Sequence, residues 1–188
     1  MQREFPTAPI AGVGAVVLDA ELRVLLVRRG QEPLLGEWSL PGGALELGER
    51  LEDGVRREVR EETGLEVEPE EIVAVFDHIS HAGDNPARVR FHYVLVDYRC
   101  RVLGGALRSA TDATEARWAA WNELTGHGAL AVRPFTLSVI RKALDKALDR
   151  ARDQAPGGDR PTHASEIVTR DSFPADTIHA AEQEEPFP

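Results

Sequence analysis

The chain has 188 residues, of which 42% are hydrophobic and 29% are charged. This is the composition of a folded globular protein with one domain and at most a small appendage. It carries 32 acidic and 22 basic side chains, a formal net charge of −10, which argues against sequence-independent binding to nucleic acid or to anionic membranes. A phosphate ligand would need a divalent cation as intermediary. We therefore expect neither nucleic acid nor membrane among the partners.

The cellular compartment is indicated by two features of the sequence. The single cysteine, Cys100, excludes an intrachain disulfide framework and offers no thiolate cluster for zinc. The first ten residues lack the basic and apolar segments of a secretion signal, and no stretch of the chain is as apolar as a membrane span. Both features predict a cytoplasmic protein.

The first part of the chain predicts two strands, a loop and a helix. Residues 10–19 and 22–29 are apolar and rich in β-branched side chains, so we expect two strands that form a hairpin. Glycine and proline then predict a loop with a short extended piece at 38–40. A helix is expected over about 51–63, because Gly64 and the apolar residue after it form a typical helix end.

The second part continues in a mixed order of strands and helices. Strands are predicted at 72–81 and 89–100, separated by a reversal that contains Gly, Asn and Pro. A strand at 116–121 leads into a helical turn near Asn122, and a helix follows over about 134–151. The order predicts an α/β fold without an internal repeat.

A change of composition divides the chain into a domain at 1–151 and a tail at 152–188. The tail is acidic and rich in proline, with scattered apolar residues. Such segments cannot bury enough apolar surface to fold alone, so we interpret the tail as flexible. The alternative is that part of it docks on a second subunit or over the active site.

The helix at 51–63 carries acidic side chains in an unusual place. On a helical wheel, Glu58 and Glu62 project along the apolar stripe formed by Val55 and Val59, with Glu61 beside them. Carboxylates three and four residues apart repel one another, so a positive group is expected between them. A purely solvated acidic face is the alternative, and the wheel disfavours it.

The positive group can be a side chain or a metal ion. Arg57 is displaced on the wheel, so we expect it to pair with Glu61 or with an upstream acid rather than to fill the cluster. The remaining place suits a hard cation with oxygen ligands, Mg²⁺ or alternatively Mn²⁺. Zinc is a poor second choice, because the cluster holds neither cysteine nor histidine.

The spacing of these residues resembles the signature of the Nudix hydrolases. That signature is Gly, five residues, Glu, seven residues, then Arg-Glu-aliphatic-x-Glu-Glu-x-Gly-aliphatic. This sequence matches it at every position: Gly43, Glu49, Arg57, Glu58, Val59, Glu61, Glu62, Gly64 and Leu65. A match with fixed gaps over so many positions is far more specific than a lone glycine motif. The resemblance implies a Nudix-type α/β/α sandwich with a mixed sheet, covering roughly residues 8–150.

The resemblance also implies roles for the matching residues. Glu58, Glu61 and Glu62 would be the main metal ligands, and the backbone carbonyl of Gly43 a further one. Arg57 would orient the glutamates, and Glu49 would support the cluster from the preceding loop. Two further local features concern the helix at 51–63. Gly54 inside the helix suggests close packing against a strand, and the helix start lacks a Ser, Thr or Asp, so Glu49 or water is expected to cap it.

The implied reaction is hydrolysis of a phosphoanhydride that is activated by bound cations. The expected products are a nucleoside monophosphate and a phosphorylated second moiety. A general base is needed, and the candidates are Asp112, Glu115 and Glu61, of which we favour Asp112. Glu61, Glu62, Arg57 and Asp112 are thus the candidate catalytic residues.

The candidates for substrate binding are Arg28, Arg29 and Trp38. The two arginines end a strand and would contact phosphate or nucleoside, with a solvated strand end as the alternative. Trp38 either lines the pocket or packs in the core, as large aromatic residues more often do. The histidines lack ligand spacing and are interpreted as structural: His78, His81 and His92.

Sequence segments outside the signature narrow the range of expected substrates. The segments at 13–17, 24–29, 36–43 and 88–100 resemble the ADP-ribose pyrophosphatase group of the Nudix hydrolases, which implies cleavage of ADP-ribose to AMP and ribose 5-phosphate. One alternative is a house-cleaning (d)NTP pyrophosphohydrolase, and another is a non-catalytic nucleotide-sensing module. Relatives of the ADP-ribose type are frequently homodimers, so a homodimer is among the implied assemblies.

Overall fold

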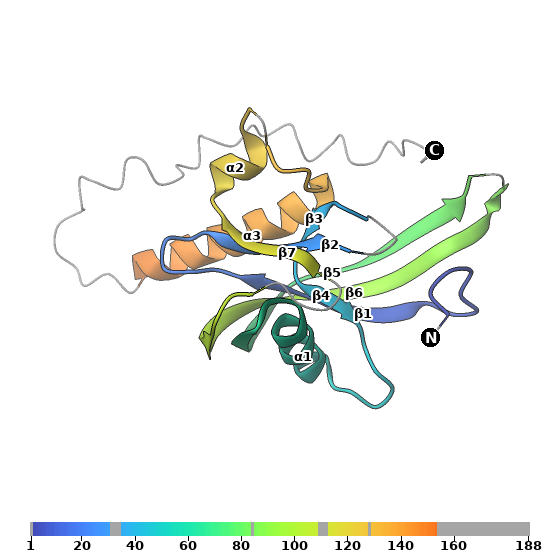
Figure 1. Ribbon diagram of the computed structural model, residues 1–188, viewed down its shortest axis with the longest axis horizontal. Helices are drawn as coiled ribbons and strands as arrows, with labels where there is room; N and C mark the ends of the chain where they lie inside the picture. The colour runs from blue at the N-terminus through green and yellow to red at the C-terminus, as the bar shows by residue number, and fades with distance from the viewer. Residues whose placement is uncertain (1, 31–34, 84, 109–112, 128, 154–188) are drawn as a thin grey trace.

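The structure, a computed structural model, describes residues 2–30, 35–83, 85–108, 113–127 and 129–153 (Figure 1). The predicted tail from residue 154 onward lies outside these ranges. The strands are β1 (Ile10–Val17), β2 (Val24–Arg29), β3 (Trp38–Ser39), β4 (Gly42–Ala44), β5 (Leu65–Ala82), β6 (Asn85–Gly105) and β7 (Ala113–Ala119). The helices are α1 (Leu51–Thr63), α2 (Trp121–Thr125) and α3 (Pro134–Asp153).

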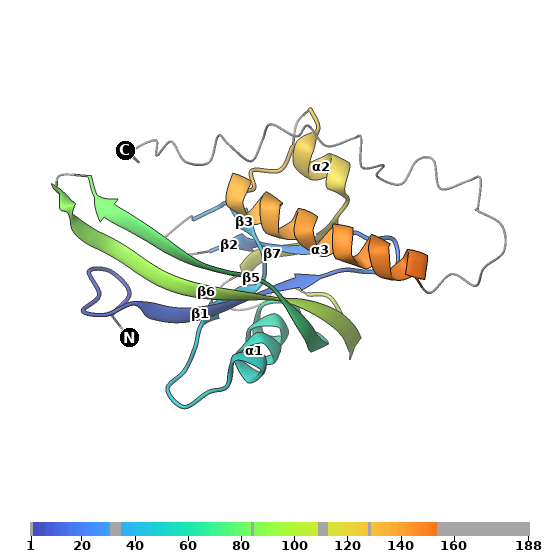
Figure 2. The ribbon, with the colours of Figure 1, turned by 180° about the vertical axis from the view of Figure 1, so that it is seen from behind.

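The strands form two sheets between helical layers. The first sheet has the order β4-β1-β6-β5 and the second the order β3-β2-β7. Strands β1 and β6 are parallel, and the other pairs are antiparallel. Helix α1 lies on one side of the sheets, and α2 and α3 lie on the other (Figures 1 and 2). The predicted mixed α/β sandwich is therefore confirmed.

The core has two parts because β1 is buried on both faces. Val13, Ala15 and Val17 pack with Val55 and Val59 of α1. The other face of β1 contributes to a second cluster, which lies under α2 and α3. Its members are Val16, Val24, Leu26, Trp38, Ala119, Leu124, Val139, Ile140, Ala143 and Leu144. Successive side chains of a strand point to opposite faces, and burial of both faces explains why the sequence of β1 is apolar almost throughout.

The predicted hairpin between the first two strands is wrong. Strands β1 and β2 both form, but they lie in different sheets, and among the described pairings only one isolated bridge, Leu18 to Val24, joins this part of the chain. A strand has two edges, and β1 uses one for β4 and the other for β6. No edge remains for β2, which pairs instead with β3 and β7.

The other predicted elements are confirmed, and strands β5 and β6 are longer than expected. Helix α1 spans Leu51–Thr63, and Gly64 adopts the left-handed conformation with φ of 70°, as expected for this type of helix end. Strands β5 and β6 pair as an antiparallel ribbon whose far end runs out beyond the rest of the described chain (Figures 1 and 2).

Two local expectations for α1 need correction. Glu49 does not cap the helix: no side-chain cap bond forms at Arg50, because the Glu49 carboxylate is engaged with Arg57 and with the amide of Glu46. Gly54 does allow close packing, but against a loop rather than a strand. A methyl group at Gly54 would lie 2.6 Å from Cδ2 of Leu45.

Candidate active site

Strand β4 brings the backbone of the glycine pair against the glutamates of α1. The amide of Gly42 donates a hydrogen bond of 2.9 Å to Oε2 of Glu62. A methyl group at Gly43 would lie 2.4 Å from Oε1 of Glu58, a separation that requires either glycine or a displaced carboxylate. Two of the three predicted glutamate ligands therefore lie directly against β4.

Arg57 holds the acidic side chains together. Its Nε and Nη2 donate hydrogen bonds of 2.8 and 2.9 Å to the two oxygens of Glu49. Its Nη1 donates 2.8 Å to Glu58 and 3.3 Å to Glu61. The predicted pairing with Glu61 and an upstream acid is present, but the expectation that Arg57 stays out of the cluster is wrong, because its side chain also reaches Glu58. A helical wheel places only the origin of a side chain, and arginine is long.

Charge and burial differ among the three glutamates. The side chain of Glu58 is 14% exposed and that of Glu61 is 47% exposed, whereas Glu62 is buried at 8%. Burial raises the pKa of Glu58, and the opposing effect of Arg57 does not fully offset it. The hydrogen bonds from Arg57 lower the pKa of Glu49 and raise that of Arg57. A further cation beside Glu58 would therefore stabilise the charged form of its carboxylate.

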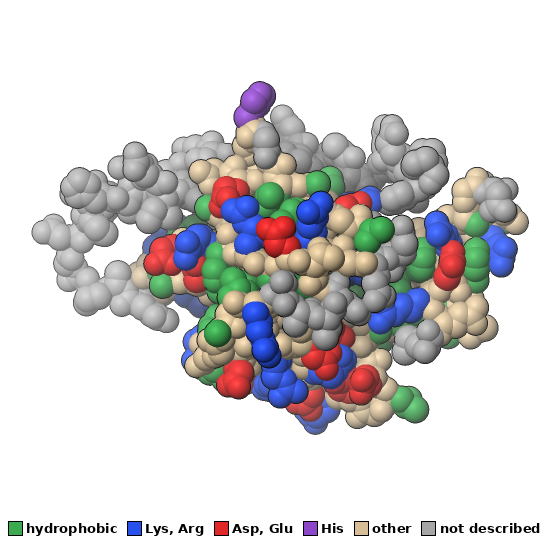
Figure 3. Space-filling model, viewed as in Figure 1, with side chains coloured by type: hydrophobic (Ala, Val, Ile, Leu, Met, Phe, Trp, Pro, Cys, Tyr) green, Lys and Arg blue, Asp and Glu red, His purple; other side chains and the backbone are tan. Residues whose placement is uncertain are grey.

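The carboxylate oxygens of the three glutamates suit a hard cation, although they do not point toward one common position in this structure. Within the described ranges no three acidic, histidine or cysteine side chains are arranged to hold a metal ion, because Glu58 and Glu61 face Arg57 while Glu62 faces Gly42. The available donors are carboxylate oxygens beside the backbone of β4. An all-oxygen set of this kind suits a hard divalent cation. The acidic and basic side chains are interspersed around α1 (Figure 3).

Comparison with known proteins identifies the fold and the signature. The family model described as NUDIX domain matches residues 8–142, which is most of the chain. The chain belongs to the Nudix family. The signature on α1 and its surroundings is therefore that of a Nudix hydrolase.

Curated relatives differ in the substrates that their names state. A MutT-like protein of Streptomyces ambofaciens is 34% identical over 120 residues, covering 64% of this chain and 70% of the relative. An ADP-ribose pyrophosphatase of Methanocaldococcus jannaschii is 33% identical over 108 residues, covering 57% and 60%. A human 8-oxo-dGDP phosphatase is 35% identical over 108 residues, covering 57% of this chain but 30% of the relative.

Solved structures show the same Nudix fold. A NUDIX hydrolase of Nitrosomonas europaea matches with a TM-score of 0.61 and 23% identity, covering 74% of this chain and 90% of that one. An ADP-ribose pyrophosphatase of Streptococcus suis matches with a TM-score of 0.53 and 25% identity, covering 74% and 92%. The first likeness concerns the fold alone.

The remaining predicted residues of the Nudix domain lie in three settings. Arg28 donates from Nε to the carbonyl of Gly36 at 3.0 Å, and Arg29 follows it at the end of β2. Trp38 is 8% exposed within the second core cluster, which is the packing alternative, and its contact with substrate stays a prediction. Asp112 lies outside the described residues, whereas Glu115 is on β7 opposite Arg28.

The sequence analysis did not single out Asp97 or Arg3. Asp97, on β6, is 5% exposed, and burial raises its pKa to about 7. The positive charge of Arg3 acts on both Glu58 and Tyr93, so the N-terminal segment comes near the glutamates. An acidic residue at an inward position of an alternating strand was the available signal for Asp97.

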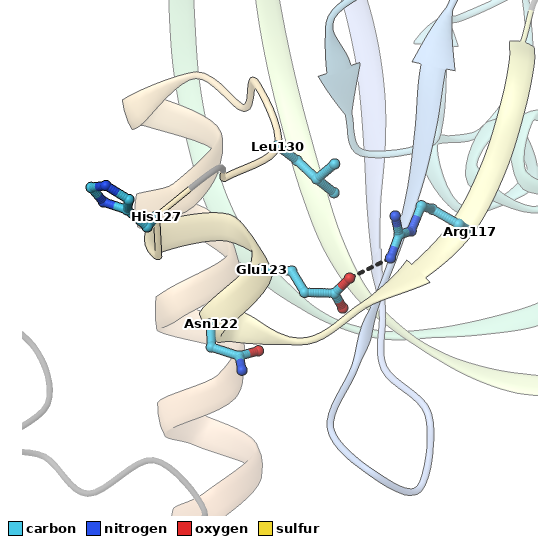
Figure 4. A pocket seen from close by; sticks show the side chains of 5 residues that line it. All are labelled: Arg117, Asn122, Glu123, His127 and Leu130. Carbon is cyan, nitrogen blue, oxygen red and sulfur yellow. Dashed lines mark hydrogen bonds and ion pairs between the residues drawn. The ribbon is translucent and has the colours of Figure 1, made fainter.

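A separate hollow of about 290 Å³ lies between β7 and α2 (Figure 4). Its charged side chains are already paired: Glu123 binds Arg117 and accepts a hydrogen bond of 2.8 Å from the amide of Ala120. The hollow lies on the opposite side of the sheets from α1 (Figure 1). We therefore do not include it in the candidate active site.

Proposed function

We propose that this Nudix hydrolase cleaves the diphosphate linkage of a nucleoside diphosphate attached to another moiety, with ADP-ribose as substrate and AMP and ribose 5-phosphate as products. The observation that carries the proposal is the complete signature folded into one place, with α1 against β4 and Arg57 among the carboxylates. The name of the archaeal relative supports the choice of ADP-ribose.

The residues proposed to hold Mg²⁺, or Mn²⁺, are Glu58, Glu61 and Glu62 with the carbonyl of Gly43, supported by Glu49. When bound, such a cation neutralises the diphosphate oxygens and lowers the pKa of a coordinated water. The chain has a net charge of −10, so a cation held by these carboxylates would offset the repulsion between the protein and an anionic diphosphate.

Arg57 organises this cluster. Its bidentate pair with Glu49 fixes the guanidinium against the loop before α1, and planar pairs of this kind are geometrically specific. The remaining nitrogen is then directed at Glu58 and Glu61. Arg57 thereby offsets the repulsion between neighbouring glutamates and holds them close to β4. We propose that it acts as a positioning residue.

For the general base we propose Asp112, with Glu115 and Glu61 as alternatives. A general base must come within hydrogen-bonding reach of the attacking water. Glu61 is half exposed beside Arg57, whereas Glu115 lies on β7 opposite Arg28. Replacement of Asp112 or Glu115 by its amide tests these two, since loss of the base lowers kcat at an unchanged metal requirement. Glu61 is also a proposed metal ligand, so its amide is expected to raise the metal requirement as well.

For substrate contacts we propose Arg28 and Arg29. Both lie at the end of β2, and arginine is well suited to phosphate recognition. The charge of Arg29 reaches the hydroxyl of Tyr93 on β6. This effect supports the proposal that Arg29 contributes positive charge on the Tyr93 side of β6.

A substrate panel tests the proposed reaction. It contains ADP-ribose, sugar nucleotides, dinucleotides and 8-oxo-dGTP, each with Mg²⁺ or Mn²⁺. We expect AMP and ribose 5-phosphate from ADP-ribose at the highest kcat/KM. If the protein cleaves no member of the panel, the proposed hydrolase function is overturned.

A second candidate is a house-cleaning activity on (d)NTPs or oxidised nucleotides. The MutT-like and 8-oxo-dGDP phosphatase relatives favour it. The products distinguish the two candidates, because this activity releases pyrophosphate or phosphate rather than ribose 5-phosphate. Tight ADP-ribose binding without AMP formation would instead indicate a nucleotide sensor.

The proposed setting is the cytoplasm, and the proposed assembly is a homodimer. Cys100 is the single cysteine and is buried as a free thiol, and a chain without an intrachain disulfide suits a reducing compartment. Among the described residues no helix is long and apolar enough to cross a membrane. Light scattering of the purified protein tests the homodimer.

A further inference from the structure

Asp97 occupies a buried position that only a neighbouring glycine makes possible. It lies on β6, opposite Gly14 of β1, and is 5% exposed. A methyl group at Gly14 would lie 2.2 Å from Oδ1 of Asp97. The carboxylate therefore lies over β1, in space that any other residue at position 14 would fill.

The carboxylate of Asp97 has no partner in the described part of the chain. No hydrogen bond or ion pair joins it to a described residue, and burial is the only cause of its raised pKa. Buried polar groups are nearly always hydrogen-bonded, and those that are not call for an explanation. A carboxylate on a side chain that is buried to this extent is costly without a donor, so a donor that arrives with a ligand would explain its presence.

The position of Asp97 connects it to the Nudix glutamates. Gly14 pairs with Gly42 of β4, and the amide of Gly42 donates to Glu62. Leu95, on the same face of β6, lies over Gly12 in the same way. A methyl group added at Gly12 would lie 2.8 Å from Cδ2 of Leu95 and 3.0 Å from the carbonyl oxygen of Gly43. Side chains from this face of β6 thus lean across β1 toward the glycine pair.

The same face of β6 opens toward solvent beyond Asp97. Leu95 and Tyr93 follow on this face, since alternate residues of a strand share a side, and both are only partly buried. Arg3 acts electrostatically on both Tyr93 and Glu58. The strip of Tyr93, Leu95 and Asp97 lies on the face of β6 opposite the one that packs on α1, and it runs from partly exposed side chains to a buried acceptor.

We propose that Asp97 binds the uncharged part of the substrate, accepting a hydrogen bond from a hydroxyl or amino group of its nucleoside. This inference rests on the proposed function. A carboxylate repels the anionic diphosphate, which belongs with the glutamates and their cation, so the group that reaches Asp97 is neutral and carries a donor. The ribose hydroxyls and the adenine amino group are the donors that AMP provides.

Binding of AMP to the full-length protein without divalent metal tests the proposal. Calorimetry compares the wild type with Asp97→Asn, Asp97→Leu and the matched control Asp77→Asn. Asp77 is exposed and pairs with Val94, on the other face of the same sheet. Hydrogen bonds to charged groups are strong, so we expect Asp97→Leu to weaken AMP binding at least about tenfold, Asp97→Asn to weaken it less, and the control to match the wild type.

Melting temperatures measured at pH 8 show whether the Asp97 variants are folded. Both Asp97 variants are expected to melt at or above the wild-type temperature, because they remove a buried charge. Unchanged AMP binding in Asp97→Leu overturns the proposal, as does a wild type that binds no AMP. If AMP binding depends on Asp97 but ADP-ribose is not hydrolysed, the proposed function fails while the binding role stands.

A series of ligands tests the proposal on the wild type, without any variant. It compares AMP with IMP, in which an oxo group replaces the amino group, and with 2′-deoxy-AMP and 3′-deoxy-AMP, each of which lacks one ribose hydroxyl. We expect one analogue to bind about tenfold more weakly than AMP, which would identify the group that Asp97 contacts. Equal affinity for all four nucleotides overturns the proposal.

Discussion

The guanidinium of Arg57 forms two parallel hydrogen bonds, of 2.8 and 2.9 Å, with the carboxylate of Glu49. A lysine at position 57 would keep the charge but lose this planar pair. We expect Arg57→Lys to lower kcat for ADP-ribose by about ten- to a hundredfold, because displacing groups that position a site commonly costs that much, with a smaller change in KM.

The matched control for Arg57 is Arg56→Lys on the same helix. Arg56 pairs with Asp53 and Glu68 at the surface, away from the cluster, and surface ion pairs contribute little. Its kinetics should match the wild type. If Arg57→Lys and Arg56→Lys behaved alike, Arg57 would have no positioning role.

Glu62→Gln should abolish most of the turnover while the fold persists. The amide keeps the volume and an acceptor for the Gly42 amide, but it loses the charge that a cation ligand needs. We expect kcat to fall by at least about a hundredfold with an unchanged melting temperature. Glu52→Gln on the exposed side of α1 is the control, and a near-wild-type rate in Glu62→Gln would exclude Glu62 as a metal ligand.

Gly43→Ala should separate activity from folding. The added methyl would lie 2.4 Å from Oε1 of Glu58, and the flexible end of that side chain can move away. We expect kcat to fall about tenfold or more, as for other displaced catalytic groups, with a small loss of melting temperature. Gly83→Ala is the control, since a methyl there meets no atom within 4 Å; equal rates in both variants would argue against close packing of Glu58 on β4.

The raised pKa of Asp97 predicts that the stability of the protein falls as the pH rises. Its pKa rises from 3.8 to about 7 in the folded state, so the folded protein binds more protons than the unfolded chain between these values. Its contribution to the free energy of unfolding therefore falls as pH rises through this range, by at most about 4 kcal/mol. Urea unfolding at pH 5 and pH 8.5 should show this loss in the wild type and not in Asp97→Asn, and parallel profiles for the two proteins would contradict it.

Local features of the chain could be predicted from the sequence, whereas long-range pairings could not. The bounds of α1 follow from its apolar spacing and from Gly64, which act within a few residues. The partner of β1 depends on residues 93–100, far along the chain, and an apolar run does not specify which strand it meets.

The site shows the same division between local and distant contacts. The inward position of Glu58 and Glu62 could be read from the wheel, but the contact of Arg57 with Glu49 needed the path of the loop before α1. Asp97 was missed because the alternation of β6 does not reveal that β1 carries glycine opposite it.

The central claim is that the glutamates of α1 support hydrolysis of a diphosphate through a bound divalent cation. Its most direct test is quantification of the products formed from ADP-ribose by the wild type, first with EDTA and then with excess Mg²⁺. The account predicts no products with EDTA, and equal amounts of AMP and ribose 5-phosphate once Mg²⁺ is added. Equal rates with and without the chelator, or no products under either condition, would contradict it.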